Sequence, residues 1–304
     1  MDRKRNLLGC FLILAGTMGG GISACMIEAI FTAHPDLSAL WVLSVRMILA
    51  GGLMVLVAFA RGGRHSFDFL KDKATLFYFF LFAMSGMLLS QYGYFEAVRW
   101  SNASTATVLK ATAAVFVLLI VCIANRRLPR WVETAAIGIC VAGTWLMATH
   151  GDLSGMQMDP RALVFGLAGA FCSGYYTTIT ARVMQGNDPW AVVGGAIFFS
   201  GVVFCVVSPP WATSVVWTAD LVINMAGVTF FGTIWGYMLA LIGISMVGPV
   251  TGIVLAKNET IVSILLSVIV LKRRFLPVDY LGFAMVLGAV IMISVSSAKA
   301  PAKQ

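Results

Sequence analysis

Two lysines stand inside long apolar stretches of this sequence. Lys110 lies in the stretch "TATVLKATAAVFVLLIVCIANRR" at 105–127, and Lys257 lies 147 residues later in "GIVLAKNETIVSILLSVIVLKRR" at 252–274. A charge removed from water is costly unless it is paired. Each ammonium group is therefore suited to hold a carboxylate or a phosphate, and we ask which elements position it.

The composition indicates that the chain folds in a lipid bilayer. Of 304 residues, 60% are apolar and 11% are charged, and the mean hydropathy is +0.91. Soluble domains are about half apolar and about a quarter charged. The formal charge of +8 does not indicate nucleic-acid binding here, because most of it lies in short breaks between apolar runs. The sequence predicts an all-α integral membrane protein.

A helix needs about 20 apolar residues to cross the hydrocarbon. Ten runs of this kind are present, and the breaks between them carry Gly, Pro and charged residues typical of loops. We predict ten transmembrane helices near 7–31, 38–60, 74–98, 103–123, 131–149, 161–184, 189–208, 220–243, 249–271 and 277–296.

The two halves of the chain align without a gap at an offset of 147 residues. This offset superposes Lys110 on Lys257, and Arg126 and Arg127 on Arg273 and Arg274. A duplicated unit of five spans inserts its second copy upside down, because five is odd. We therefore predict two inverted five-helix repeats, 1–150 and 151–304, an architecture of secondary transporters that bind substrate where the halves meet.

Lysine and arginine also predict the orientation. With the amino terminus inside, cytoplasmic segments hold most of these residues, so both termini are expected in the cytoplasm and the chain in the plasma (inner) membrane. The cluster Lys272 to Arg274 lies outside in this topology. The inverted repeat accounts for it, since its counterpart after the fourth span faces inward.

These residues resemble the EamA-type members of the drug/metabolite transporter superfamily over nearly the whole chain. The resemblance is carried by "LSVRMILAGGL", where Arg46 matches the family's arginine, and by "AKNETIVSILLSVIVLKRRFLPVDYLGFAMVLGAVIM", where Glu259 matches the glutamate of a Glu-Pro signature. It implies ten spans in two inverted repeats. Thr260 and Ala113 stand where the family usually has proline, so neither subfamily nor substrate can be carried over.

The two lysines are the first candidates for substrate binding. Each lies seven or eight residues into its span, or roughly 10–12 Å at 1.5 Å per residue, on opposite sides of the midplane. They are similar in position to lysines that contact phosphate in the nucleotide-sugar and sugar-phosphate branches of the superfamily. The alternative is a closed network in which carboxylates such as Glu28, Glu96 or Glu259 neutralise both lysines.

Glu259 is expected on a different face from Lys257, because two residues turn a helix by about 200°. Either Glu259 pairs with a neighbouring group, or it takes part in proton coupling. Arg46 is expected to tie the second span to a neighbour, Glu96 to pair locally with Arg99 three residues on, and Glu28 to reach the outer interface. We assign Arg46, Glu28 and Glu96 to structure.

Aromatic and small polar residues cluster in three spans, in "SQYGYF", "SGYYTT" and "FFGTIWGY". An aromatic wall with a few hydrogen-bonding groups suits small solutes. Together with the lysines and Glu259, this pattern predicts a binding site that includes Gln91, Tyr94, Tyr176, Trp235 and Tyr237. Packing between helices is the alternative interpretation of these aromatics.

No catalytic set is grouped in the sequence, which has neither a metal-ligand cluster nor a Gly-rich phosphate loop, so an enzyme is not expected. We expect a secondary transporter of small polar metabolites, such as amino acids or related carboxylates, working by alternating access in export or exchange. Phosphorylated or other organic anions, and cationic drugs or amines, are alternatives. The expected partners are a small-molecule substrate and lipids, with no cofactor and no nucleic acid; a homodimer is left open.

Overall fold

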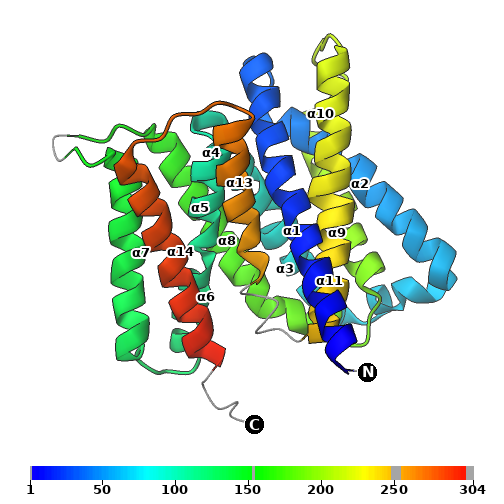
Figure 1. Cartoon of the computed structure of the whole chain (residues 1–304). Helices are drawn as coiled ribbons and strands as arrows, with labels where there is room; N and C mark the ends of the chain where they lie inside the picture. Colours follow the sequence, from blue (N-terminus) through cyan, green and yellow to red (C-terminus); the bar gives the residue numbers. More distant parts are fainter. Residues whose placement is uncertain (1, 153–154, 248–254, 299–304) are drawn as a thin grey trace.

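The computed structural model of the chain describes residues 2–152, 155–247 and 255–298, and within these ranges every regular element is a helix. Figure 1 shows the helices standing side by side in one bundle, with the start of α1 and the end of α14 at the same end. All hydrogen bonds of a helical backbone stay within the segment, as lipid requires.

The first repeat contains helices up to α7, in five spans. Two of these spans are divided. The elements are α1 (Asp2–Ala33), α2 (Ala39–Gly62), η1 (Gly63–Lys71, a 3₁₀ helix), α3 (Lys73–Phe82), η2 (Ala83–Leu89, a π helix), α4 (Ser90–Trp100), α5 (Ala103–Ala111), α6 (Ala113–Ala124) and α7 (Trp131–Thr149).

The second repeat follows the same order, and again the third span is divided by a π helix. Its elements are α8 (Pro160–Met184), α9 (Pro189–Val207), α10 (Ala219–Thr229), η3 (Phe230–Trp235, a π helix), α11 (Gly236–Val247), α13 (Asn258–Ile269) and α14 (Pro277–Ala298).

Within the described ranges, nine helical segments are long and apolar enough to cross a membrane, and α13 is a shorter apolar helix of 12 residues. The nine segments fall on nine of the ten predicted runs. The tenth run, predicted at 249–271, contains α13, but its start up to residue 254 lies outside the described residues. The ten-helix prediction is confirmed.

The helices start where the sequence supplies an acceptor for free backbone N–H groups. Ser38 accepts from the N–H of Trp41 before α2, and Asn102 accepts from the N–H of Thr105 before α5. Asp159 caps α8, whose first residue, Pro160, has no N–H to satisfy. Such caps stabilise a helix by about 1 kcal/mol each. The sequence thus fixes the span boundaries locally.

The packing of the helices follows the duplication. α2 packs on α9, and α7 packs on α14, so that equivalent spans of the two repeats meet. α1 packs on α11 as α8 packs on α4, which is the same contact with the repeats exchanged. This pattern of contacts is what a pseudo-twofold axis between inverted repeats produces.

The π-helical segments repeat at the same offset as the lysines. η2 begins at Ala83 and η3 begins at Phe230, 147 residues later. After η2, α4 runs so close to α8 that a Cβ on Gly93 would lie 2.8 Å from the Cα of Gly169. Wide turns of this type occur frequently at functional sites. η3 borders the cavity described next through Gly232, whereas η2 leads directly into α4, whose Gln91 and Tyr94 line it.

Candidate substrate-binding cavity

A cavity of about 690 Å³ lies in the middle of the bundle, between the two repeats. Its walls come from α1, α2, α4, α5, α6, α8, η3, α11, α13 and the end of α14. The cavity extends toward the end of the bundle where α1 begins (Figure 1). There it is lined by residues near the carboxyl-terminal ends of α11 and α14, namely Ile244, Ile293 and Ser294. The volume suits a small solute.

Both candidate lysines lie where a span is interrupted. Lys110 is the penultimate residue of α5, and Thr112 separates α5 from α6. Lys257 has a turn conformation immediately before α13 begins at Asn258. Interrupted spans that meet at a central site are typical of transporters with inverted repeats. The two lysines are thus equivalent in local structure as well as in sequence.

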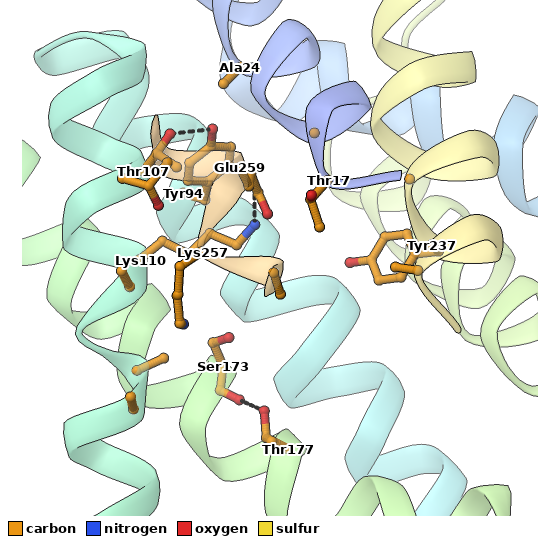
Figure 2. Close-up of a pocket in the computed structure, with 18 of the residues that line it drawn as sticks. Thr17, Ala24, Tyr94, Thr107, Lys110, Ser173, Thr177, Tyr237, Lys257 and Glu259 are labelled. Atoms are coloured by element: carbon orange, nitrogen blue, oxygen red, sulfur yellow. Dashed lines mark hydrogen bonds and ion pairs between the residues drawn. The ribbon is translucent and has the colours of Figure 1, made fainter. Parts of the chain in front are cut away.

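Lys110 forms an ion pair with Glu259 that joins the two repeats. Its Nζ donates to Oε1 of Glu259 at 3.0 Å and lies 5.0 Å from the centre of the Tyr94 ring (Figure 2). The Lys110 and Glu259 side chains are 33% and 26% exposed, so the pair borders the cavity. A Cβ on Gly20 would lie 3.0 Å from the Glu259 carboxyl carbon, so glycine there gives the carboxylate room beside α1.

Lys257 lines the same cavity, but with the residues that the structure describes it makes neither a hydrogen bond nor an ion pair. We expected Lys257 and Glu259 on different faces of one helix, and this expectation is wrong. The 200° relation holds only for a continuous helix, and here the chain turns at Lys257 before α13 starts. Both side chains therefore reach the cavity.

The opposite wall is built around Arg46 of α2, whose side chain is 4% exposed. Its Nε donates to Oγ1 of Thr233 at 3.0 Å, and its other nitrogens donate at 3.5 Å to Oε1 of Gln91 and to the Gly232 carbonyl. Nε2 of Gln91 in turn donates to the Tyr237 hydroxyl at 3.1 Å. Arg46, assigned to structure from sequence, lines the cavity as well as tying α2 to η3.

Three of the predicted aromatic residues line the cavity, and one does not. Tyr94 and Tyr237 contribute to its walls together with Tyr176, which packs edge-on against Phe82 at 5.6 Å. Trp235 instead points outward, is 39% exposed and donates from its indole N–H to the Ala15 carbonyl. It lies two residues before Tyr237, on the other side of the helix. We therefore remove Trp235 from the predicted site.

Glu28 and Glu96 have structural partners. Glu28 is 3% exposed, accepts from Nε of Arg273 at 2.6 Å and accepts from the N–H of Ala103 at 2.8 Å, so it does not reach out to the interface as expected. Glu96 accepts from the Trp100 indole at 2.9 Å and lies 3.8 Å from Arg99. The Arg273 contact also gives the basic cluster at 272–274 a partner.

At the end of the bundle away from the start of α1, α1, α5 and α13 are in close contact. The Ser104 hydroxyl donates to the Ser263 carbonyl at 3.3 Å, and Thr107 donates to the Ser263 hydroxyl at the same distance. Sγ of Cys25 lies 3.8 Å from the Ser267 hydroxyl. These contacts join the repeats and, among the described residues, close the bundle beyond the cavity.

Small hydroxyl residues of the cavity wall were not named as site residues from the sequence, although two of them lie in the quoted stretch "SGYYTT". They are Thr17, Ser23, Thr107, Ser173, Thr177, Thr260 and Ser294. Their signal in the sequence is weak, because the hydroxyl of a Ser or Thr inside a span commonly donates to a backbone carbonyl of its own helix, as Thr177 does to Ser173 (Figure 2).

In the part of the chain that the structure describes, no group of His, Cys, Asp and Glu is arranged to hold a metal.

Known proteins resemble the whole chain. The model of the EamA-like transporter family matches residues 7–149 and 160–295. The "Uncharacterized inner membrane transporter YicL" of Salmonella typhimurium is 27% identical over 286 residues, which is 94% of each chain. A solved structure described as "Crystal structure of protein" covers 98% of this chain and 99% of its own, with a TM-score of 0.62 and 14% identity, and so supports the fold alone. Since the family model matches well over half of the residues, this chain belongs to the EamA-like transporter family and is a membrane transporter.

Proposed function

We propose that this transporter carries small solutes with a carboxylate group, such as amino acids or related carboxylates, and that Lys257 binds the carboxylate. One observation carries the proposal. The Lys257 ammonium faces the cavity with no acidic partner among the described residues, whereas Lys110 already has Glu259. An ammonium in partly dry surroundings gains most from an anion that comes to it.

The charges around the cavity support this choice. Of the charged side chains that line it in the described ranges, Arg46, Lys110 and Lys257 are cationic and Glu259 is anionic. An excess of positive charge attracts anions and repels amines. Efflux of a cationic drug is therefore the less favoured alternative. An organic phosphate offers the same oxygen acceptors as a carboxylate, and a binding experiment separates the two.

The proposed mechanism is alternating access. The cavity extends toward the end where α1 begins, while contacts among α1, α5 and α13 close the other end. Because the repeats are inverted copies, exchanging their conformations would open the second end and close the first. The ion pair of Lys110 with Glu259 and that of Glu28 with Arg273 both join the repeats and would rearrange in this step.

The orientation of the chain decides which side of the membrane this conformation faces. The excess of Lys and Arg in alternate loops supports cytoplasmic termini, and the relative YicL is named an inner membrane transporter. With that orientation, the cavity of this conformation loads from the cytoplasm. Export or exchange across the inner membrane is the direction that we propose.

The test is binding to purified protein, measured by calorimetry and by ligand-induced thermal stabilisation. Amino acids, monocarboxylates, sugar phosphates and amines are compared on the wild type and on Lys257→Gln. We expect the carboxylates to bind and the substitution to weaken them about tenfold or more, as loss of a charged hydrogen bond would. Lys71→Gln is the matched control, because Lys71 is 81% exposed and far from the cavity in η1. Equal binding by Lys257→Gln, or binding of amines alone, would overturn the proposal.

A further inference from the structure

The hydrogen bonds of Arg46, Gln91 and Tyr237 run in one direction. An arginine has only N–H donors, so the Gln91 atom that faces it must be the carbonyl Oε1, at 3.5 Å. The amide nitrogen of Gln91 then faces Tyr237 and donates to its hydroxyl oxygen at 3.1 Å. Arg46 thereby fixes which way the Gln91 amide is turned.

This order leaves the Tyr237 proton without an internal acceptor. The hydroxyl oxygen already accepts from Gln91, so its own O–H has to donate elsewhere. Within the described residues, the bond from Gln91 is the hydrogen bond that Tyr237 makes, and its side chain lines the cavity. Figure 2 shows the hydroxyl end of Tyr237 turned toward Lys110 and Lys257 across the cavity. Tyr237 is therefore a donor aimed into the cavity.

The charge behind this donor is that of Arg46. The guanidinium is nearly buried and, among the described residues, has no carboxylate within ion-pair distance. It is held by neutral groups, the Thr233 hydroxyl, the Gly232 carbonyl and the Gln91 amide, and by the face of the Phe95 ring at 5.1 Å. Chains of hydrogen bonds polarise one another, so the cation strengthens Tyr237 as a donor.

We propose that the Tyr237 hydroxyl is a second anion-binding group, and that the preferred solute carries an anionic group at each end, as an α,ω-dicarboxylate does. This inference rests on the proposed function, since the other end of the solute is placed at Lys257. The positive excess of the cavity and its volume of about 690 Å³ both suit such a dianion. Arg46 and Gln91 are positioning residues, because they act through Tyr237.

Calorimetry on the purified full-length chain tests the proposal with two matched series of probes. The first is the α,ω-dicarboxylates from malonate to adipate, and the second is the monocarboxylates with the same numbers of carbons. We expect the best dicarboxylate to bind about tenfold more tightly than its monocarboxylate, the gain from one hydrogen bond to a charged group. Tyr237→Phe should remove that advantage, so that the ratio of dicarboxylate to monocarboxylate affinity falls toward one.

Gln91→Glu reverses the direction of the hydrogen bonds without changing the shape of the side chain. A carboxylate at position 91 accepts from Arg46 and also from the Tyr237 hydroxyl, whose proton then turns away from the cavity. We expect Gln91→Glu to lose the dicarboxylate advantage although Tyr237 is intact. In the double variant with Tyr237→Phe, no further loss is expected, because the two changes remove the same donor.

Three outcomes separate the proposals. If no carboxylate binds, both the proposed function and this inference fail. If carboxylates bind but dicarboxylates have no advantage, or if Tyr237→Phe weakens both series equally, the second anion-binding group is refuted while Lys257 stands. If Gln91→Glu keeps the advantage, the directional role of Gln91 and Arg46 is refuted.

Discussion

Glu28 and Arg273 form an ion pair between the first span of one repeat and the segment after α13 of the other. The Arg273 Nε lies 2.6 Å from Oε1 of Glu28, and the second carboxylate oxygen accepts from the N–H of Ala103 at the start of α5. The carboxylate thus bridges three segments at the closed end of the bundle. In the proposed alternating-access mechanism, opening that end requires the bridge to break, so the ion pair would stabilise the closed conformation.

Replacing Arg273 should weaken the closed end. Arg273→Gln leaves the buried Glu28 carboxylate without its cation, and because Arg273 is half-exposed we expect a loss of about 1–3 kcal/mol, seen as a lower unfolding temperature in detergent. The matched control is Arg274→Gln, since Arg274 is exposed and has no ion pair among the described residues. Equal unfolding temperatures for the two variants would contradict a role for the pair.

A disulfide across the closed end should stop transport. Cys25 and Ser267 face each other at 3.8 Å between Sγ and Oγ, so Ser267→Cys places two thiols within bonding reach. Oxidation is expected to abolish solute exchange in proteoliposomes, and a reductant should restore it, because the repeats then separate again. Ser267→Cys combined with Cys25→Ser should be insensitive to oxidant. Full transport by the cross-linked protein would show that this end does not open.

Neutralising Glu259 should raise anion affinity. In Glu259→Gln, Lys110 loses its internal anion and becomes available to the solute, so a carboxylate is expected to bind more tightly, on the order of tenfold. The converse change, Lys110→Gln, leaves Glu259 unpaired at the cavity and should weaken binding. Calorimetry measures the carboxylate affinity of both variants, which is expected to rise in Glu259→Gln and to fall in Lys110→Gln. Changes in the same direction would exclude this electrostatic account.

Trp235 should be dispensable for binding. Because its indole faces away from the cavity and donates to the Ala15 carbonyl, Trp235→Phe is expected to change carboxylate affinity by less than about twofold while losing a hydrogen bond worth about 1 kcal/mol. Thermal unfolding and calorimetry on the same sample test the two parts. A large loss of affinity with unchanged stability would return Trp235 to the binding site.

The spans were predictable because local rules determine them. Hydrocarbon thickness sets their length, and residues such as Ser38, Asn102 and Asp159 mark their starts. The duplication could also be recognised in the sequence, and the π helices that begin at Ala83 and Phe230 recur at the offset of 147 residues that relates the two lysines. The division of the repeats between residues 150 and 151, like the roles of the site residues, stays a prediction.

What the sequence did not reveal depends on departures from a regular helix. The turn at Lys257 brings this lysine and Glu259 into one cavity, although a continuous helix would separate them. The partner of Glu28 is 245 residues away, and no local pattern encodes such a contact. The wide turn of η3 ends at Trp235, and the extra residue in that turn rotates every later side chain by roughly 100° about the helix axis. The helix face on which a later side chain lies therefore cannot be predicted by counting residues in the sequence.

The wall of Arg46, Gln91 and Tyr237 has no counterpart in the other repeat. At the offset of 147, Tyr237 corresponds to Ser90 and Gln91 to Met238. The two sides of the cavity descend from one duplicated unit, yet their hydrogen-bonding chemistry differs. A solute held by that wall consequently meets different groups at its two ends, an ammonium at one and a hydroxyl backed by a guanidinium at the other, even when the solute itself is symmetric.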